Sequence, residues 1–278
     1  MKSSISRRAV TASLLAGAVV LATPGAAFSA TSTADNQRAD PHRHPAKPTI
    51  VLIHGAFADA SSWGAVVERL LRQGHHVLAP ALPLRGLASD AAYVRSVVDS
   101  VPGPILLVGH SYGGSVISQA AAEFPRVKAL VYVAAFVPDI GESALELTNK
   151  YPGSTLAQAT STQSYPLPGG GTGEELIIKR DLFRAQFAAG VPDPTAQVMA
   201  AGQRPVAVAA LQEKAIAAAW KEIPSWYLVA AEDRNIPPAA EQGMAERAGA
   251  RTITVRAPHA VAVSDPGPVT DLILRAAC

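Results

Sequence analysis

A serine flanked by glycines is the first candidate for chemistry in this chain. Gly109, Ser111 and Gly113 form a G-x-S-x-G pattern between an apolar run, residues 105–108, and an amphipathic stretch. Glycines at both positions allow a sharp strand-to-helix turn that raises the serine above a sheet, where it can act as a nucleophile. A serine hydroxyl is a weak nucleophile until a base removes its proton, so the pattern predicts catalysis only with a histidine nearby.

The base should lie on a loop at the same edge of the sheet as the serine. His259, in Ala-Pro-His-Ala, directly follows the last apolar run and is the base by position. The other histidines lie in a polar segment (His42, His44), at the start of a strand on the opposite edge (His75, His76) or in turns near the site (His54, His110). For His54 and His110 we expect local hydrogen bonding. His42 and His44 have no further ligands beside them, so they do not predict a metal site.

A base of this kind needs a carboxylate that fixes its tautomer and stabilises the imidazolium. Asp233 follows the penultimate strand, and the chain order Ser, Asp, His is the one expected for this architecture. Glu232 is adjacent but is expected to point elsewhere on the turn. Asp139 follows an earlier strand and competes for the role, because its loop can also reach a histidine.

A tetrahedral intermediate needs two preorganised N–H donors for its oxyanion. The Tyr112 N–H, directly after the candidate nucleophile, is expected to supply one. The loop His54-Gly55-Ala56-Phe57 can supply the other, from Ala56, because glycine at 55 permits close approach of the backbone.

Six apolar, β-branched runs alternate with amphipathic stretches, and they are expected to position these residues. The expected strands cover 49–53, 76–79, 105–108, 127–135, 226–231 and 252–255, and helices are expected over 60–73 and, with Ser89 as N-cap, over 90–100. Near-continuous apolar strands alternating with helices predict an α/β fold, a mostly parallel, doubly wound sheet covered on both faces.

The pattern changes between about residues 138 and 205. The segment 164–172, SYPLPGGGT, is rich in Pro and Gly, and we expect no sheet strand there. Residues 174–189 and 194–201 show helical spacing of apolar side chains. We therefore expect a helical lid inserted into one domain that spans residues 48–278.

Composition limits the class of protein. The chain has 278 residues, of which 49% are apolar and 17% charged, with a formal net charge of +2. This excludes global disorder, and the absence of a dense Lys/Arg stripe argues against a nucleic-acid partner. The single cysteine, Cys278, excludes an intrachain disulfide and a Cys-based zinc site.

The first thirty residues have the layout of a secretory signal. Three basic residues (Lys2, Arg7, Arg8) precede an apolar run and then small residues, and the Ser-Arg-Arg start resembles a twin-arginine signal. The apolar run is short for a membrane span, so we expect secretion, with cleavage within 27–30 and a flexible tether over 31–47. Removing residues 1–30 changes the formal charge from +2 to about −1.

These motifs together resemble the α/β-hydrolase superfamily over residues 48–277. IVLIHGAFADASSW, GHSYGG, AEDRNIPP and APHAVAVSDP are similar to the lid-bearing branch with bacterial esterases, plant methylesterases and hydroxynitrile lyases. The resemblance implies Ser111 as nucleophile, Asp233 and His259 as its partners, and Ala56 and Tyr112 as oxyanion donors. It implies no cofactor and no metal.

The resemblance leaves the reaction open. Lyases of the branch have threonine in place of the HGA glycine and lysine after the catalytic histidine, where this chain has Gly55 and Ala260, which disfavours that activity. A cofactor-free perhydrolase or haloperoxidase, a lactonase, a carbon–carbon bond hydrolase and a non-catalytic small-ligand binding protein remain alternatives. The leading hypothesis is a serine esterase for a small to medium apolar ester, with no stable membrane span and an oligomeric state that the sequence does not indicate.

Overall fold

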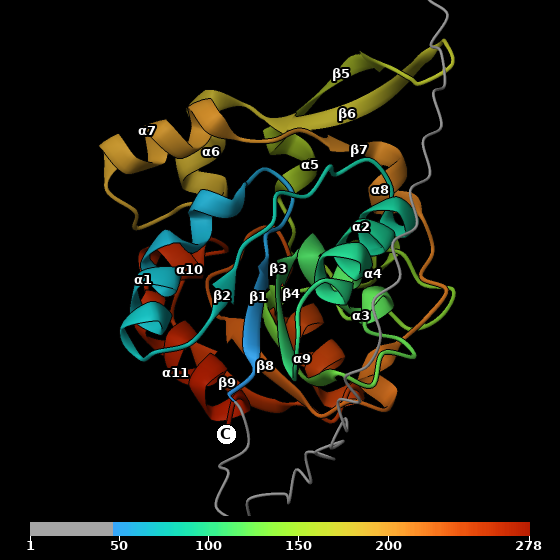
Figure 1. The fold of residues 1–278 in the computed structure, drawn as a ribbon. Coiled ribbons are helices and arrows are strands. Elements are labelled where there is room, and N and C mark those ends of the chain that lie inside the picture. The colour runs from blue at the N-terminus through green and yellow to red at the C-terminus, as the bar shows by residue number, and fades with distance from the viewer. Residues whose placement is uncertain (1–46) are drawn as a thin grey trace, which may run out of the picture. The chain divides into compact units, whose positions relative to one another are not determined.

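A computed structural model describes residues 47–278; the expected signal peptide, nearly all of the tether, and the first two histidines of the chain lie outside the described residues. A six-stranded sheet with all neighbours parallel forms the centre of this part of the chain, in the order β2-β1-β3-β4-β8-β9 (Figure 1). Its strands are β1 Thr49–Ile53, β2 Val77–Leu78, β3 Ile105–Ser111, β4 Val127–Ala135, β8 Ser225–Ala230 and β9 Arg251–Val255. The predicted fold class, a mostly parallel sheet flanked by helices, is confirmed.

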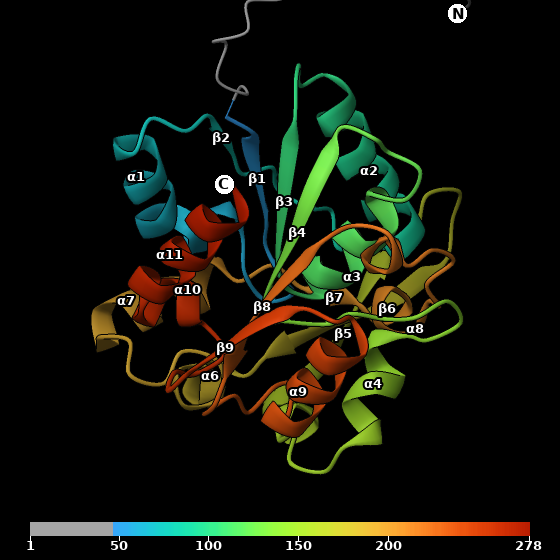
Figure 2. The same ribbon diagram turned by 90° about the horizontal axis from the view of Figure 1, so that it is seen from below.

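Helices cover both faces of the sheet, which explains why its strands are apolar at consecutive positions. In β3, Ile105 and Leu107 belong to one buried cluster and Leu106 and Val108 to another, because side chains alternate between the faces of a strand. Figure 2 shows the two layers: on one face α1 Gly64–Arg72, α10 Val261–Ser264 and α11 Pro266–Ala276, and on the other α2 Leu87–Asp99, α3 Tyr112–Ala120 and α9 Pro238–Arg247.

The helix boundaries follow local signals. In α1, Val66 and Leu70 lie four residues apart and are both buried, and Gly74, at φ +74°, follows the helix end in a conformation that glycine adopts without strain. The N-cap prediction for α2 was wrong. The helix begins at Leu87 with Gly86 as N-cap, and Ser89 lies in the first turn, where its hydroxyl donates to the Gly86 carbonyl at 3.0 Å.

The parallel sheet collects the candidate site at one edge. Because the strands run in one direction, their carboxyl ends lie together, and the loops after β1, β3, β8 and β9 emerge side by side. These loops follow Ile53, Ser111, Ala230 and Val255, and they carry the candidate oxyanion, nucleophile, acid and base residues.

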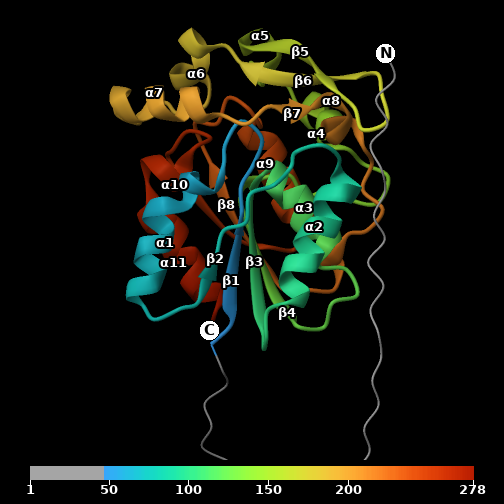
Figure 3. The same cartoon turned by 45° about the horizontal axis from the view of Figure 1, so that its top comes forward.

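The chain between β4 and β8, residues 136–224, is called the insertion below, and it extends over that edge of the sheet (Figure 3). Its elements are α4 Ala144–Lys150, α5 Leu156–Ala159, β5 Thr160–Pro166, β6 Thr172–Ile178, α6 Arg180–Gln186, α7 Asp193–Gly202, β7 Val206–Ala207, α8 Val208–Gln212 and the 3-10 turn η2 Ala219–Lys221. Outside the insertion, a 3-10 turn, η1 Ala60–Trp63, precedes α1. The strands form an antiparallel sheet in the order β5-β6-β7.

The hairpin β5–β6 corrects the prediction that 164–172 holds no strand and that 174–189 is one helix. Only residues 167–171 form the turn, with Gly169, Gly170 and Gly171 all at positive φ. Pro166 ends an edge strand, a position that tolerates the missing N–H. The apolar residues after position 174 lie partly in strand β6 and partly in helix α6, which begins only at Arg180. Their spacing therefore resembles that of one continuous helix. Among residues 47–278, no helix is both long and apolar enough to cross a bilayer.

Candidate functional site

The backbone at Ser111 is held in a conformation that an ordinary serine avoids. Ser111 has φ 53° and ψ −124° at the junction of β3 and α3, and it is 6% exposed. The flanking glycines make the turn sterically feasible: a Cβ on Gly109 would lie 2.6 Å from the Gly113 carbonyl oxygen, and one on Gly113 would lie 2.5 Å from the Ile53 carbonyl oxygen. Such strain persists only where the surrounding structure enforces it, and it is found at functional sites.

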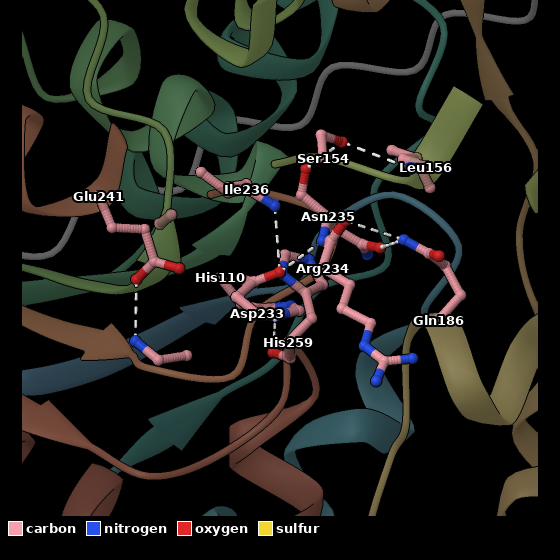
Figure 4. A network of polar contacts seen from close by, with 12 residues as sticks. His110, Ser154, Leu156, Gln186, Asp233, Arg234, Asn235, Ile236, Glu241 and His259 are labelled. Carbon is pink, nitrogen blue, oxygen red and sulfur yellow. Dashed lines mark hydrogen bonds and ion pairs between the residues drawn. The ribbon is translucent and has the colours of Figure 1, made fainter. Parts of the chain in front are cut away.

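Asp233 lies in the loop after β8, and three donors hold its carboxylate. Oδ1 accepts from the backbone N–H groups of Asn235 at 2.6 Å and Ile236 at 3.0 Å, and Oδ2 lies 2.5 Å from Nδ1 of His259 (Figure 4). Both members of the His–Asp pair are buried, His259 at 1% exposure. The contact leaves Nε2 of His259 as the ring nitrogen that is free to exchange a proton with a reacting group.

The loop after β9 presents His259 between fixed neighbours. The His259 carbonyl lies 2.9 Å from Nε2 of His110, and the ring of Phe187 lies 5.1 Å from the His259 ring, nearly edge-on. The Ala260 N–H donates to the Phe187 carbonyl at 3.0 Å. Within residues 47–278, no hydrogen bond joins the Ser111 hydroxyl to His259. The structure therefore brings Asp233 and His259 together and places Ser111 at the same edge of the sheet, at the end of β3.

The candidate oxyanion donors lie on the loops after β1 and β3. The Tyr112 N–H opens α3, where a helix has no internal acceptor for it, and both Ala56 and Tyr112 line the same cavity as Ser111. Gly55 lies against the elbow, since a Cβ there would be 2.6 Å from Cβ of Ser111. The Phe57 N–H is already used, donating to the Arg204 carbonyl at 3.1 Å, which leaves Ala56 as the donor to test on that loop.

His54 and His110 are buried, and their rings contact backbone groups. His54 Nε2 accepts from the Leu82 N–H at 2.8 Å, so the ring is neutral with its proton on Nδ1, which donates to the Gly55 carbonyl at 2.9 Å. Burial lowers the pKa of both rings, that of His110 well below its ordinary range, with the nearby His259 adding to the effect on His110.

The competing carboxylates are paired elsewhere. Asp139 lies 2.5 Å from Lys221, and this hydrogen bond is the main reason that the pKa of Asp139 is lowered. Glu232 lies 2.6 Å from Nε of Arg256. Three carboxylates were candidates for the acid that orients His259. In the described part of the chain, only Asp233 of these three lies against His259.

Residues 50–272 match the Alpha/beta hydrolase family. The chain belongs to that family. It is 26% identical over 252 residues to an alpha/beta hydrolase, nvfD, of Aspergillus novofumigatus, covering 83% of this chain and 97% of that protein. A second relative, Methylesterase 1 of Arabidopsis thaliana, is 26% identical over 155 residues, covering 50% of this chain and 59% of the relative.

The same fold occurs in solved structures. The crystal structure of polyneuridine aldehyde esterase superposes with a TM-score of 0.71 at 20% identity, covering 83% of this chain and 99% of that one. The predicted resemblance to the esterase branch of the α/β hydrolases is thereby confirmed.

The hydrolase encloses a cavity of about 420 Å³ next to Ser111. Its floor is formed by the loops after β1, β3 and β8, and its walls by α4, α5 and the hairpin of the insertion. Among the described residues, no charged side chain lines it; the lining is Ala56, Phe57, Ser111, Tyr112, Phe136, Ala144, Leu145, Thr148, Asn149, Ser154, Leu156, Ala157, Thr160, Ser161, Thr162, Leu176, Leu211, Asn235 and Ile236.

Sequence reasoning missed the polar network that joins the insertion of this hydrolase to the Asp233 loop. Gln186, at the end of α6, donates to Asn235 Oδ1 at 2.8 Å and to the Arg234 carbonyl at 2.9 Å, and accepts from Thr155 at 2.8 Å (Figure 4). The Ser154 hydroxyl donates to the Asn235 carbonyl at 2.8 Å. Gln186 lies 48 and 49 residues from Arg234 and Asn235 and 31 residues from Thr155, so no sequence spacing indicated the contacts. Among residues 47–278, no group of three or more His, Cys, Asp or Glu side chains is placed to hold a metal ion.

Proposed function

We propose that this hydrolase cleaves an uncharged carboxylic ester of small to medium size through an acyl-enzyme on Ser111. The observation that carries the proposal is the buried Asp233–His259 contact of 2.5 Å at the strand ends beside the strained Ser111 elbow. An activated serine needs this order of groups: a nucleophile, a base and a carboxylate that orients the base.

The first half of the reaction forms the acyl-enzyme. Ser111 Oγ attacks the ester carbonyl carbon while its proton passes to Nε2 of His259, and Asp233 stabilises the imidazolium through Nδ1. The negative charge on the carbonyl oxygen is held by the N–H groups of Ala56 and Tyr112. His259 then gives the proton to the departing alkoxide, which leaves as the alcohol.

The second half regenerates the enzyme. A water gives a proton to His259 and attacks the acyl carbon, and collapse of the intermediate returns the proton to Ser111 and releases the acid. Hydrogen bonds between a nucleophile and its base commonly tighten when a substrate is bound. We expect Ser111 to turn toward Nε2 when an ester occupies the cavity.

The cavity limits the substrate. Its volume of about 420 Å³ is that of a small-molecule site, and among residues 47–278 its lining has no cation to pair with an anionic group. Polar side chains such as Thr148 and Asn149 lie at the α4 wall, so a substrate with a few hydrogen-bonding groups fits as well as a purely apolar one.

Turnover of a panel of p-nitrophenyl esters tests the proposed reaction. We expect wild-type protein to hydrolyse neutral esters and Ser111→Ala to lose at least a thousandfold in kcat. Equal rates for the two proteins would refute the proposal. Release of cyanide, carbon–carbon cleavage or peracid formation at a higher kcat/KM would instead favour one of the alternative reactions.

We also propose that the protein acts outside the cell. The support is the basic, apolar and small-residue sequence of residues 1–30. N-terminal sequencing of protein recovered from the medium should find a start within or just after 27–30, and an intact Met1 on the folded protein would contradict export with cleavage.

A further inference from the structure

A second carboxyl group lies buried beside Asp233 and has no part in the reaction described above. Glu241 is on α9, the helix that follows the Asp233 loop, and its side chain is 0% exposed. Its Oε2 accepts from the Ala230 N–H at 2.9 Å (Figure 4), and its carboxyl faces that of Asp233. Within residues 47–278, none of the ion pairs includes Glu241.

The hydrogen bonds decide which of the two carboxyls carries the proton. Asp233 accepts from two backbone N–H groups and faces Nδ1 of His259, so three donors already surround its two oxygens. Glu241 has one donor, and its Oε1 has no partner among the described residues when it is counted as an acceptor. Two carboxylates that face each other in a dry site are not both charged, so we place the proton on Glu241, which has fewer donors.

Protonation at Oε1 also satisfies the unpaired atom. The O–H then has an acceptor in Asp233, which offers about four lone-pair directions, three of which face Asn235, Ile236 and His259. Burial, and secondarily the charge of Asp233, raise the pKa of Glu241 well above its ordinary range. The other titratable group that faces Glu241 is the phenol of Tyr227 on β8, itself buried and neutral.

We propose that Glu241 is a protonated acid that donates its O–H to Asp233, and that it is a positioning residue for the Asp233–His259 pair. Its hydrogen bond fills the remaining acceptor site of Asp233 and fixes the rotation of that carboxylate without placing a second charge beside it. The role in turnover rests on the proposed function; the location of the proton does not.

Infrared difference spectroscopy on the full protein tests the location of the proton. At pH 7 we expect the wild-type minus Glu241→Gln spectrum to contain the carbonyl stretch of a protonated carboxylic acid. The matched control is Glu246→Gln, which removes an exposed carboxyl from the same helix and should give no such band. Absence of the band from the wild-type minus Glu241→Gln spectrum would mean that Glu241 is ionised and would overturn the proposal.

Kinetics of ester hydrolysis test the positioning role. Gln can donate to Asp233 and accept from Ala230, whereas Met fills a similar volume and can do neither. We expect kcat of Glu241→Met to be at least tenfold below that of Glu241→Gln, with KM values within twofold. Equal kcat values would leave Glu241 only a packing residue and would overturn the role.

The pH profile of Glu241→Gln decides the same question if the Met variant does not fold. An ionised Glu241 would favour protonation of His259, so its replacement by Gln would move the acidic limb of kcat/KM to lower pH. A neutral Glu241 predicts an acidic limb that stays in place, and a shift of one pH unit or more would contradict the proposal. If wild-type protein hydrolyses no ester, the proposed function fails while the infrared band still decides where the proton lies.

Discussion

At the scale of single residues, the site depends on which buried groups carry charge. Asp233 is surrounded by donors and Glu241 is not, so we place the proton on Glu241, eight residues further along the chain. His54 and His110 are neutral by the same physics, since burial without a carboxylate partner disfavours the imidazolium.

The protonated Glu241 makes the stability of the protein depend on pH. Unfolded Glu241 is ionised at neutral pH and the folded group is protonated, so the folded state binds one proton more and is destabilised as pH rises above the ordinary glutamate range. Between pH 5 and 8, the free energy of unfolding of the wild-type protein should fall more steeply with pH than that of Glu241→Gln. We expect the two slopes to differ by up to about 1.4 kcal/mol per pH unit. Urea unfolding at several pH values measures this, and parallel curves for the two proteins would contradict it.

At the scale of elements, the strand-to-helix elbow between β3 and α3 depends on close contact with β1. A methyl group on Gly113 would lie 2.5 Å from the Ile53 carbonyl oxygen and 2.9 Å from that of His54. We expect Gly113→Ala to lower the free energy of unfolding by about 1–3 kcal/mol and to reduce esterase kcat at least a hundredfold, because the elbow must shift. Gly202→Ala, where a Cβ meets nothing within 4 Å, is the matched control and should keep wild-type values.

The insertion contributes to the site through Gln186, whose amide bridges α6 and the Asp233 loop. Gln186→Ala leaves the buried Oδ1 of Asn235 without its donor, which costs about 1–3 kcal/mol of stability, whereas the Arg234 carbonyl still accepts from the Thr155 N–H. We expect kcat/KM for esters to fall about tenfold as the acid loop loosens. Gln197→Ala, an exposed glutamine on α7, controls for side-chain loss within the insertion. Unchanged kinetics in Gln186→Ala would show that the network has no effect on the acid loop.

Some elements could be predicted from the sequence and others could not. Local signals predicted the parallel sheet and the turns that carry Ser111, Asp233 and His259, because apolar strands and glycine turns are encoded over a few residues. Local signals failed for β5 and β6, because a polar, threonine-rich edge strand and a short glycine turn looked like a loop. They also failed for Gln186 and Glu241, whose roles depend on contacts that only the folded chain makes. The lid role of the insertion stays a prediction.

At the scale of the whole molecule, the loops of the central sheet and the insertion together line a cavity to which the described part of the chain contributes no charged side chain. An ester that carries a carboxylate would lose its hydration there and find no cation. We expect kcat/KM for a hemisuccinate-type ester to be at least tenfold below that of a neutral ester of equal length. Equal values would show that the substrate's far end remains in water rather than in the cavity.

In the proposed mechanism, Ser111 forms a covalent acyl-enzyme with the help of His259 and Asp233. The most direct measurement is mass spectrometry of the intact protein and its peptides after reaction with a fluorophosphonate. We predict one adduct per chain on Ser111, formed at least a hundredfold more slowly in His259→Ala. Absence of an adduct, or an adduct on another residue, would contradict the account.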